Sequence, residues 1–189
     1  MNPPVETVTQ VTVQIDGADV TVDEGATILD ACTQHGIDTP TICYAENLTP
    51  VNACRVCVVE VQGNRTLVPS CSRPAEDGME IQTDSDRVRH SRRMVLEFLG
   101  TANDLSEAPE INEWSSQYGV DTTRYAEGAE RFDQPVKIQD NLYIRDYDKC
   151  VLCYKCVEAC GTDAQNTFAI AVAGRGFDAR ISTEFATPL

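Results

Sequence analysis

The sequence predicts an α+β fold in which a small sheet wraps one helix, followed by a helical connector and a short cysteine-rich segment. Three observations predict it. Residues 7–22 alternate apolar and polar side chains around Asp16-Gly17, a strong hairpin signal. A helical pattern near 27–35 follows directly, and short alternating stretches return from Val58 onward. Two groups of four cysteines lie in the remaining parts of the chain.

The first part of the chain has the element order of a β-grasp sheet. After the hairpin, the stretch ATILDACTQHG places its apolar side chains on one helical face, and Gly36 stands where a C-terminal cap is expected. Beyond a cysteine loop, three more strands are expected at Val58–Val61, Thr66–Val68 and around Ile81. Strand, strand, helix, loop and strands is the order of a sheet that grasps a single helix.

The second part is predicted to be a connector. Residues 84–99 (DSDRVRHSRRMVLEFL) have a helical pattern with four arginines expected to face away from the apolar side, and Gly100 is expected to cap the helix. Residues 101–140 are polar, with one short helix expected from Glu110 to Tyr118. We therefore predict domains at 1–83, 84–140 and 141–189.

The last segment carries a predicted hairpin. The stretch TFAIAVAGRGFDARI alternates around a turn at Gly174 to Gly176. The sequence GRG is too short for a dinucleotide-binding fingerprint, so it is interpreted as a turn.

Composition excludes several classes of function. The chain has 30 acidic and 15 basic residues, giving a formal net charge of -15, which repels nucleic acid. No stretch approaches the roughly 20 apolar residues that a membrane span needs. Nine cysteines, an odd number, with CxxC spacings and no apolar targeting run argue against a secreted disulfide framework. We expect a cytoplasmic protein without membrane insertion.

The first group of four cysteines spans Cys43 to Cys71, with ten, two and thirteen residues between successive members. Iron-sulfur clusters are held by soft thiolates, and a [2Fe-2S] cluster takes four. The CxxC pair would lie on a tight loop whose amides approach the cluster. Zinc also binds four thiolates, but it usually uses two CxxC or CxxH knuckles, and here the outer cysteines stand alone. The sequence therefore favours an iron-sulfur cluster over zinc, and zinc over disulfides.

The second group, Cys150, Cys153, Cys156 and Cys160, has the CxxCxxCxxxC spacing of a [4Fe-4S] ferredoxin run. In two-cluster ferredoxins the first three cysteines of such a run hold one cluster and the fourth holds the other. Cys160 is therefore either the fourth ligand of the same cluster or a ligand of a second one.

The stretches PTICYAENLTPVNACRVCVVEV and LVPSCSRPAEDGMEIQT resemble the N-terminal [2Fe-2S] domain of one superfamily. Its members are the large iron-sulfur subunit of respiratory complex I, the diaphorase subunit of NAD-linked nickel-iron hydrogenases, and molybdenum NAD-linked formate dehydrogenases. The resemblance covers nearly the whole chain. It implies that the [2Fe-2S] ligands are Cys43, Cys54, Cys57 and Cys71.

Two differences from these relatives are visible. Their second cysteine run is expected where this sequence ends in EFATPL, so we expect a longer polypeptide. They also usually carry a His-x3-Cys-x2-Cys-x5-Cys cluster site after the long helix, where TANDLSEAPEINEW has no histidine or cysteine. The absence of this cluster site favours the formate dehydrogenases among these relatives. His35 and His90 are interpreted as solvated or capping residues, and Cys32 as a core residue on the predicted helix.

No catalytic residue is expected in the chain, because it shows no nucleophile-base pair and no flavin or nicotinamide signature. The resemblance implies a module that relays single electrons between a molybdopterin site and a flavin/NAD diaphorase subunit, with FMN and molybdopterin only in partner domains or subunits. The alternatives are the diaphorase subunit of a hydrogenase, whose catalytic partner is nickel-iron, a stand-alone ferredoxin-like carrier, and a zinc-stabilised interaction protein.

Overall fold

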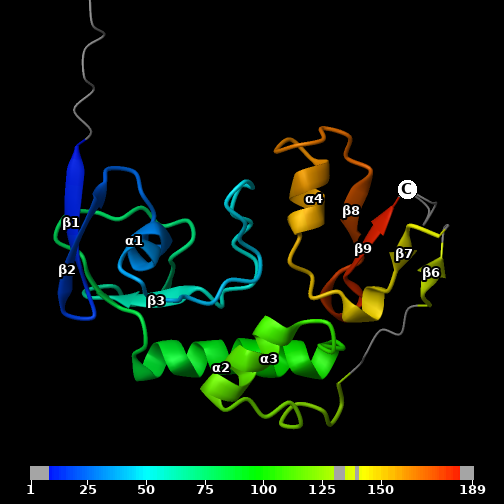
Figure 1. Ribbon diagram of the computed structural model, residues 1–189. Helices are drawn as coiled ribbons and strands as arrows, with labels where there is room; N and C mark the ends of the chain where they lie inside the picture. The colour runs from blue at the N-terminus through cyan, green and yellow to red at the C-terminus, as the bar shows by residue number, and fades with distance from the viewer. Residues whose placement is uncertain (1–8, 130–134, 139–140, 184–189) are drawn as a thin grey trace, which may run out of the picture. The chain divides into compact units, whose positions relative to one another are not determined.

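The computed structural model describes residues 9–129, 135–138 and 141–183 (Figure 1). The chain forms two compact units. One consists of Met1–Thr41 with Arg55–Ser91, and the other of Ile42–Cys54 with Arg92–Leu189. The loop that carries the first two candidate cysteine ligands is therefore grouped with the second half of the chain.

The first unit begins with the predicted hairpin. Strands β1 (Gln10–Ile15) and β2 (Ala18–Asp23) pair antiparallel with Ile15 opposite Ala18. Asp16 and Gly17 form the turn with φ of 49° and 88°, the left-handed conformation that this dipeptide tolerates. The hairpin prediction is confirmed.

Three short strands complete a mixed sheet: β3 (Val58–Val61), β4 (Val68–Pro69) and β5 (Glu80–Gln82). The strand order is β2-β1-β5-β3-β4, in which β5 runs parallel to β1 and the other pairs are antiparallel. Helix α1 (Ile28–Gln34) begins with a capping box, in which the Thr27 hydroxyl accepts the Asp30 N–H at 3.1 Å. The predicted α+β fold with a β-grasp sheet is confirmed.

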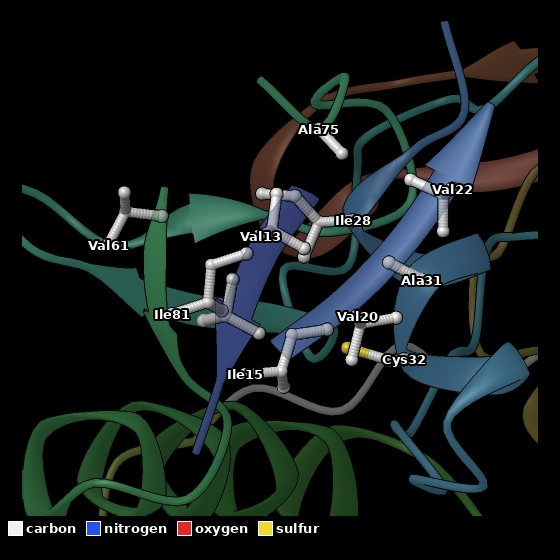
Figure 2. Close-up of a cluster of buried hydrophobic side chains, with 11 residues drawn as sticks. Val13, Ile15, Val20, Val22, Ile28, Ala31, Cys32, Val61, Ala75 and Ile81 are labelled. Atoms are coloured by element: carbon white, nitrogen blue, oxygen red, sulfur yellow. The ribbon is translucent and has the colours of Figure 1, made fainter. Parts of the chain in front are cut away.

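The core of this unit lies between α1 and the sheet (Figure 2). Cys32 is 0% exposed on α1, and its sulfur points towards Val20 of β2. The prediction that Cys32 is a core residue is confirmed. The cluster consists of inward side chains from the strands, the helix and the segment before β5: Val13, Ile15, Val20, Val22, Ile28, Ala31, Cys32, Val59, Val61, Ala75 and Ile81.

Helix α2 (Asp86–Ala102) is longer than predicted and is oriented differently. Gly100 lies inside the helix rather than capping it. A Cβ at this position would lie 2.5 Å from Cγ2 of Thr122, so close packing explains the glycine. Arg92 does not face solvent, because it is 2% exposed and donates to the Tyr118 hydroxyl at 2.7 Å. The apolar Phe98 is instead 50% exposed and stacks on Tyr125.

Helix α3 (Pro109–Tyr118) follows, with Pro109 in its first turn and Gly119 in the left-handed conformation at φ 63°. This helix of the connector was predicted almost to the residue. Residues 130–134 and 139–140 of the predicted connector lie outside the described residues.

The remaining elements of the second unit include the segment that carries the second cysteine group (Figure 1). Strands β6 (Lys137–Ile138) and β7 (Ile144–Arg145) pair antiparallel. The short helices η1 (Tyr147–Lys149) and α4 (Lys155–Cys160) lead to the predicted hairpin of β8 (Ile170–Ala173) and β9 (Arg180–Thr183), with η2 (Gly176–Asp178) in its turn. The predicted EFATPL end lies outside the described residues. Among those described, no helix has the length and apolar character needed to cross a bilayer.

Candidate metal centres

Two of the candidate [2Fe-2S] ligands meet in the first unit. Cys57 precedes β3 and Cys71 follows β4, and their sulfur atoms lie 3.4 Å apart. The pairing of β3 with β4 brings the two cysteines together. The Ser70 hydroxyl links the two segments further by donating to the Cys57 carbonyl at 2.8 Å. Both cysteines are buried, at 2% and 0% exposure.

The other two candidate ligands meet in the second unit. Hydrogen bonding with the Cys54 thiol, together with burial, raises the pKa of Cys43, whereas backbone N–H groups of Cys54 and Ala53 act in the opposite direction. Asn52 and Arg55 on either side of Cys54 have φ of 60°. This tightly wound backbone directs amides at the Cys43 sulfur. The loop thus directs backbone N–H groups at one of the candidate ligands.

The chemistry of the donor set suits an iron-sulfur cluster. None of the nine cysteines, all of which lie in the described ranges, forms a disulfide. Thiolates are soft ligands for iron, and amide N–H groups that point at sulfur compensate the negative charge of a bound cluster. Within the described residues, no three His, Cys, Asp or Glu side chains converge as a ready site for a single metal ion.

The second cysteine group lies on the loop between η1 and α4 and on α4 itself. The loop turns sharply at Leu152 and Tyr154, whose φ values are 50° and 62°. Burial raises the pKa of Cys156, and the neighbouring Cys153 and Cys150 raise it further through their negative charge. Backbone N–H groups of Cys156 and Val157 oppose this rise.

Cys160 has a different environment at the end of α4. Its sulfur accepts the Ala169 N–H at 3.1 Å and lies 3.2 Å from the Thr167 hydroxyl. The hydrogen bond from this hydroxyl lowers the pKa of Cys160, helped by backbone N–H groups of residues 168–170. The segment after the helix thus wraps around this one thiol and favours its anionic form.

The other singled-out residues lie away from these groups. His35 caps the C-terminal end of α1 and is exposed, and His90 is exposed on α2. Gly174 and Gly176 form the predicted turn with φ of 73° and 58°, and a Cβ on Gly174 would collide with the Asp178 carbonyl. The close approach of the backbone at Asp178 therefore explains the glycine at position 174.

One contact near the site was not predicted. Asp163 accepts two hydrogen bonds from Thr49, although the residues are 114 positions apart. No sequence pattern signals this pair, because neither residue belongs to a motif.

Comparisons with known proteins agree with the two cysteine groups. A 2Fe-2S iron-sulfur cluster binding domain matches residues 8–86, and a 4Fe-4S binding domain matches residues 143–165. The protein is thus an iron-sulfur protein with two cluster-binding domains. It belongs to the superfamily that contains the large iron-sulfur subunit of complex I and subunits of NAD(P)-linked hydrogenases.

Similar curated proteins extend beyond this chain. The NADP-reducing hydrogenase subunit HndD of Solidesulfovibrio fructosivorans is 38% identical over 92% of the chain and 31% of that protein. The NADH-ubiquinone oxidoreductase 75 kDa subunit of Reclinomonas americana is 35% identical over 92% of the chain and 26% of its own length. The chain thus spans about a third or less of these relatives.

The fold has a solved counterpart in an NAD+-reducing [NiFe]-hydrogenase crystallised in the H2-reduced state. The two structures align with a TM-score of 0.75 and 25% sequence identity, over 92% of this chain and 74% of the hydrogenase chain. The sequence-based resemblance to this superfamily is confirmed.

Proposed function

We propose that this chain is the iron-sulfur electron-transfer module of a multi-cofactor NAD(P)-linked oxidoreductase. The observation that carries the proposal is the coincidence of each matched cluster-binding domain with a group of four cysteines at cluster spacing. The relatives, named as a hydrogenase subunit, an NADPH-Fe(3+) oxidoreductase subunit and a complex I subunit, support it.

We assign the [2Fe-2S] ligands to Cys43, Cys54, Cys57 and Cys71. The assignment rests on their spacing, on the matched domain and on the close approach within each pair. When bound, the cluster accepts and releases single electrons at low potential, near about -400 mV for plant-type centres. The chain's own contribution is to bury Cys43, Cys57 and Cys71 and to aim backbone N–H groups at Cys43, which stabilises the negative charge of its sulfur.

We assign Cys150, Cys153 and Cys156 to a [4Fe-4S] cluster, because they have the spacing of the first three ligands of a ferredoxin run and lie in the matched 4Fe-4S binding domain. Cys160 completes this cluster or belongs to a second one. Cys160→Ala distinguishes the two assignments. If Cys160 is the fourth ligand of the same cluster, the variant should have a lower iron content and an altered [4Fe-4S] EPR signal. If Cys160 binds a second cluster, the variant should retain this signal.

The partners follow from the proposed function. A flavin/NAD-binding diaphorase subunit would exchange electrons with NAD(P), and a second partner would hold the catalytic site, in the cytoplasm. The histidine-free stretch after α2 favours a molybdopterin partner of the formate dehydrogenase type. The similarity to hydrogenase proteins favours a hydrogenase catalytic subunit as the second candidate.

Anaerobic purification of the tagged chain from its native cells tests the proposal. We expect flavin and a catalytic subunit to co-purify, and NAD(P)H to reduce both clusters only while the flavin subunit is present. Formate or H2 as the alternative electron donor distinguishes the two catalytic partners. A chain that always purifies alone as a monomer contradicts the module and favours a stand-alone carrier.

A further inference from the structure

The loop that carries Cys43 and Cys54 is tied to the segment that follows Cys160. The Thr49 N–H donates to Oδ2 of Asp163 at 2.6 Å, and the Thr49 hydroxyl donates to Oδ1 at 3.1 Å. Both carboxylate oxygens are thus used by one residue. Hydrogen bonds to a charged acceptor are stronger than those between neutral groups.

Asp163 is fixed relative to the second cysteine group. It lies in a turn closed by the Gln165 N–H to the Ala159 carbonyl at 2.9 Å and by the Asn166 N–H to the Gly161 carbonyl at 2.6 Å. The Thr167 N–H then returns to the Cys160 carbonyl at 2.9 Å. The carboxylate is therefore carried by backbone that is bonded to the end of α4.

Thr49 is fixed relative to the first group. It lies between Cys43 and Cys54, six residues after one and five before the other. It precedes Pro50, and a residue before proline is restricted to extended conformations, which limits the directions of its N–H and side chain. The adjoining Leu48 N–H donates to the Ala45 carbonyl at 3.1 Å, which closes a turn in the same loop.

We propose that the Thr49–Asp163 contact is a clamp that sets the distance and orientation between the [2Fe-2S] loop and the [4Fe-4S] segment. The inference rests on the proposed function, because the clamp matters only if electrons pass between the two clusters. Asp163 is a positioning residue, which acts through the loop and neither binds iron nor exchanges protons. Electron transfer slows steeply with distance, so a loose loop would slow the exchange while both clusters remain bound.

Graded variants remove the clamp in steps. Asp163→Ala removes both hydrogen bonds, Thr49→Val removes only the hydroxyl donor, and Thr49→Ser keeps both donors. Asp178→Ala is the matched control, because it removes an exposed carboxylate from η2 in the same part of the chain. All four variants retain every cysteine.

Amide hydrogen exchange of the full chain tests the contact without reference to electron transfer. We expect the Thr49 amide to exchange about tenfold faster in Asp163→Ala, as the loss of one charge-assisted hydrogen bond implies. Thr49→Ser and Asp178→Ala should match the unchanged protein. Equal protection in Asp163→Ala and the unchanged protein would overturn the clamp.

EPR of the fully reduced protein tests its consequence. In the unchanged protein we expect the reduced [4Fe-4S] cluster to speed the spin relaxation of the [2Fe-2S] signal. This effect should weaken in Asp163→Ala, weaken less in Thr49→Val and be restored in Thr49→Ser, with iron content constant. Unaltered relaxation in Asp163→Ala would overturn the positioning role while leaving the proposed function intact. A chain that lacks the clusters would instead contradict the proposed function, and the exchange experiment would still decide the clamp.

Discussion

At the scale of single residues, backbone amides aimed at sulfur are common to both cysteine groups. Cys43 accepts from Ala53 and Cys54, and Cys160 accepts from Ala169. Such donors have no use around an inert core thiol but stabilise a thiolate and a negatively charged cluster. Cys32 lies apart from both groups and is packed among aliphatic side chains in the core.

Cys54→Ser should abolish or strongly alter the [2Fe-2S] EPR signal, because oxygen is a harder ligand for iron than sulfur. Cys32→Ala is the matched control and should leave the signal unchanged. It should cost only about 1 kcal/mol of stability through the small cavity it creates. Loss of the signal in Cys32→Ala would show that the ligand assignment is wrong.

Glu60 should make the stability of the first unit depend on pH. Its carboxylate accepts from the Ser85 hydroxyl at 2.5 Å and pairs with Arg87 at 2.6 Å. These contacts lower the pKa of Glu60 in the folded chain, and the hydrogen bond from Ser85 makes the largest contribution. The stabilisation is therefore present above the unfolded value of about 4.3 and is lost as the pH falls through the lower, folded value.

Thermal unfolding of the unchanged protein and Glu60→Gln measures this effect. The unchanged protein should have the higher Tm at about pH 7, and the difference should shrink as the pH falls below about 4. Any contribution of the clusters cancels in the comparison. A difference that stays constant or grows on acidification would show that the carboxylate does not act in this way.

At the scale of elements, α2 shows why a polar residue can occupy a buried face. Its fully buried stripe runs through Val88, Arg92 and Leu96, at i, i+4 and i+8. Arg92 is accommodated because the Tyr118 hydroxyl accepts its hydrogen bond. The adjacent Glu97 is 0% exposed and lies 3.4 Å from Arg124.

Arg124→Ala should destabilise the second unit, because it leaves the buried Glu97 carboxylate with a weaker partner, Arg93 at 4.0 Å. Breaking a buried pair costs several kcal/mol, and the 44% exposure of Arg124 reduces the expected loss to about 2 kcal/mol. Urea unfolding followed by circular dichroism measures it. Arg175→Ala, in the exposed hairpin turn, is the control, and an equal loss in both variants would refute the role of the buried pair.

The elements that could be predicted are those specified by neighbouring residues. Asp16-Gly17 defines the first turn and Gly119 ends α3, because each supplies a backbone conformation that other residues resist. The orientation of α2 could not be predicted in this way. The hydrogen-bond partner of Arg92 lies 26 residues away in the sequence, and Thr49 lies 114 residues from Asp163. A pattern of charges along the chain contains no information about such partners.

At the scale of the whole molecule, contacts group the chain differently from its sequence order. The sequence predicts consecutive parts at 1–83, 84–140 and 141–189. By contacts, however, Ile42–Cys54 belongs with the segment that carries the second cysteine group. The loop that carries Cys43 and Cys54 thus shares a unit with the second cysteine group, and both residues of the proposed clamp lie within that unit.

The proposed function depends most directly on the two clusters. Iron, acid-labile sulfide and zinc should be determined on anaerobically purified protein, with EPR of the dithionite-reduced state. Two irons from one cluster and four from the other predict about six irons per chain, a similar amount of sulfide, and two distinct reduced-state signals. Stoichiometric zinc, no sulfide and no reduced-state signal would contradict the account.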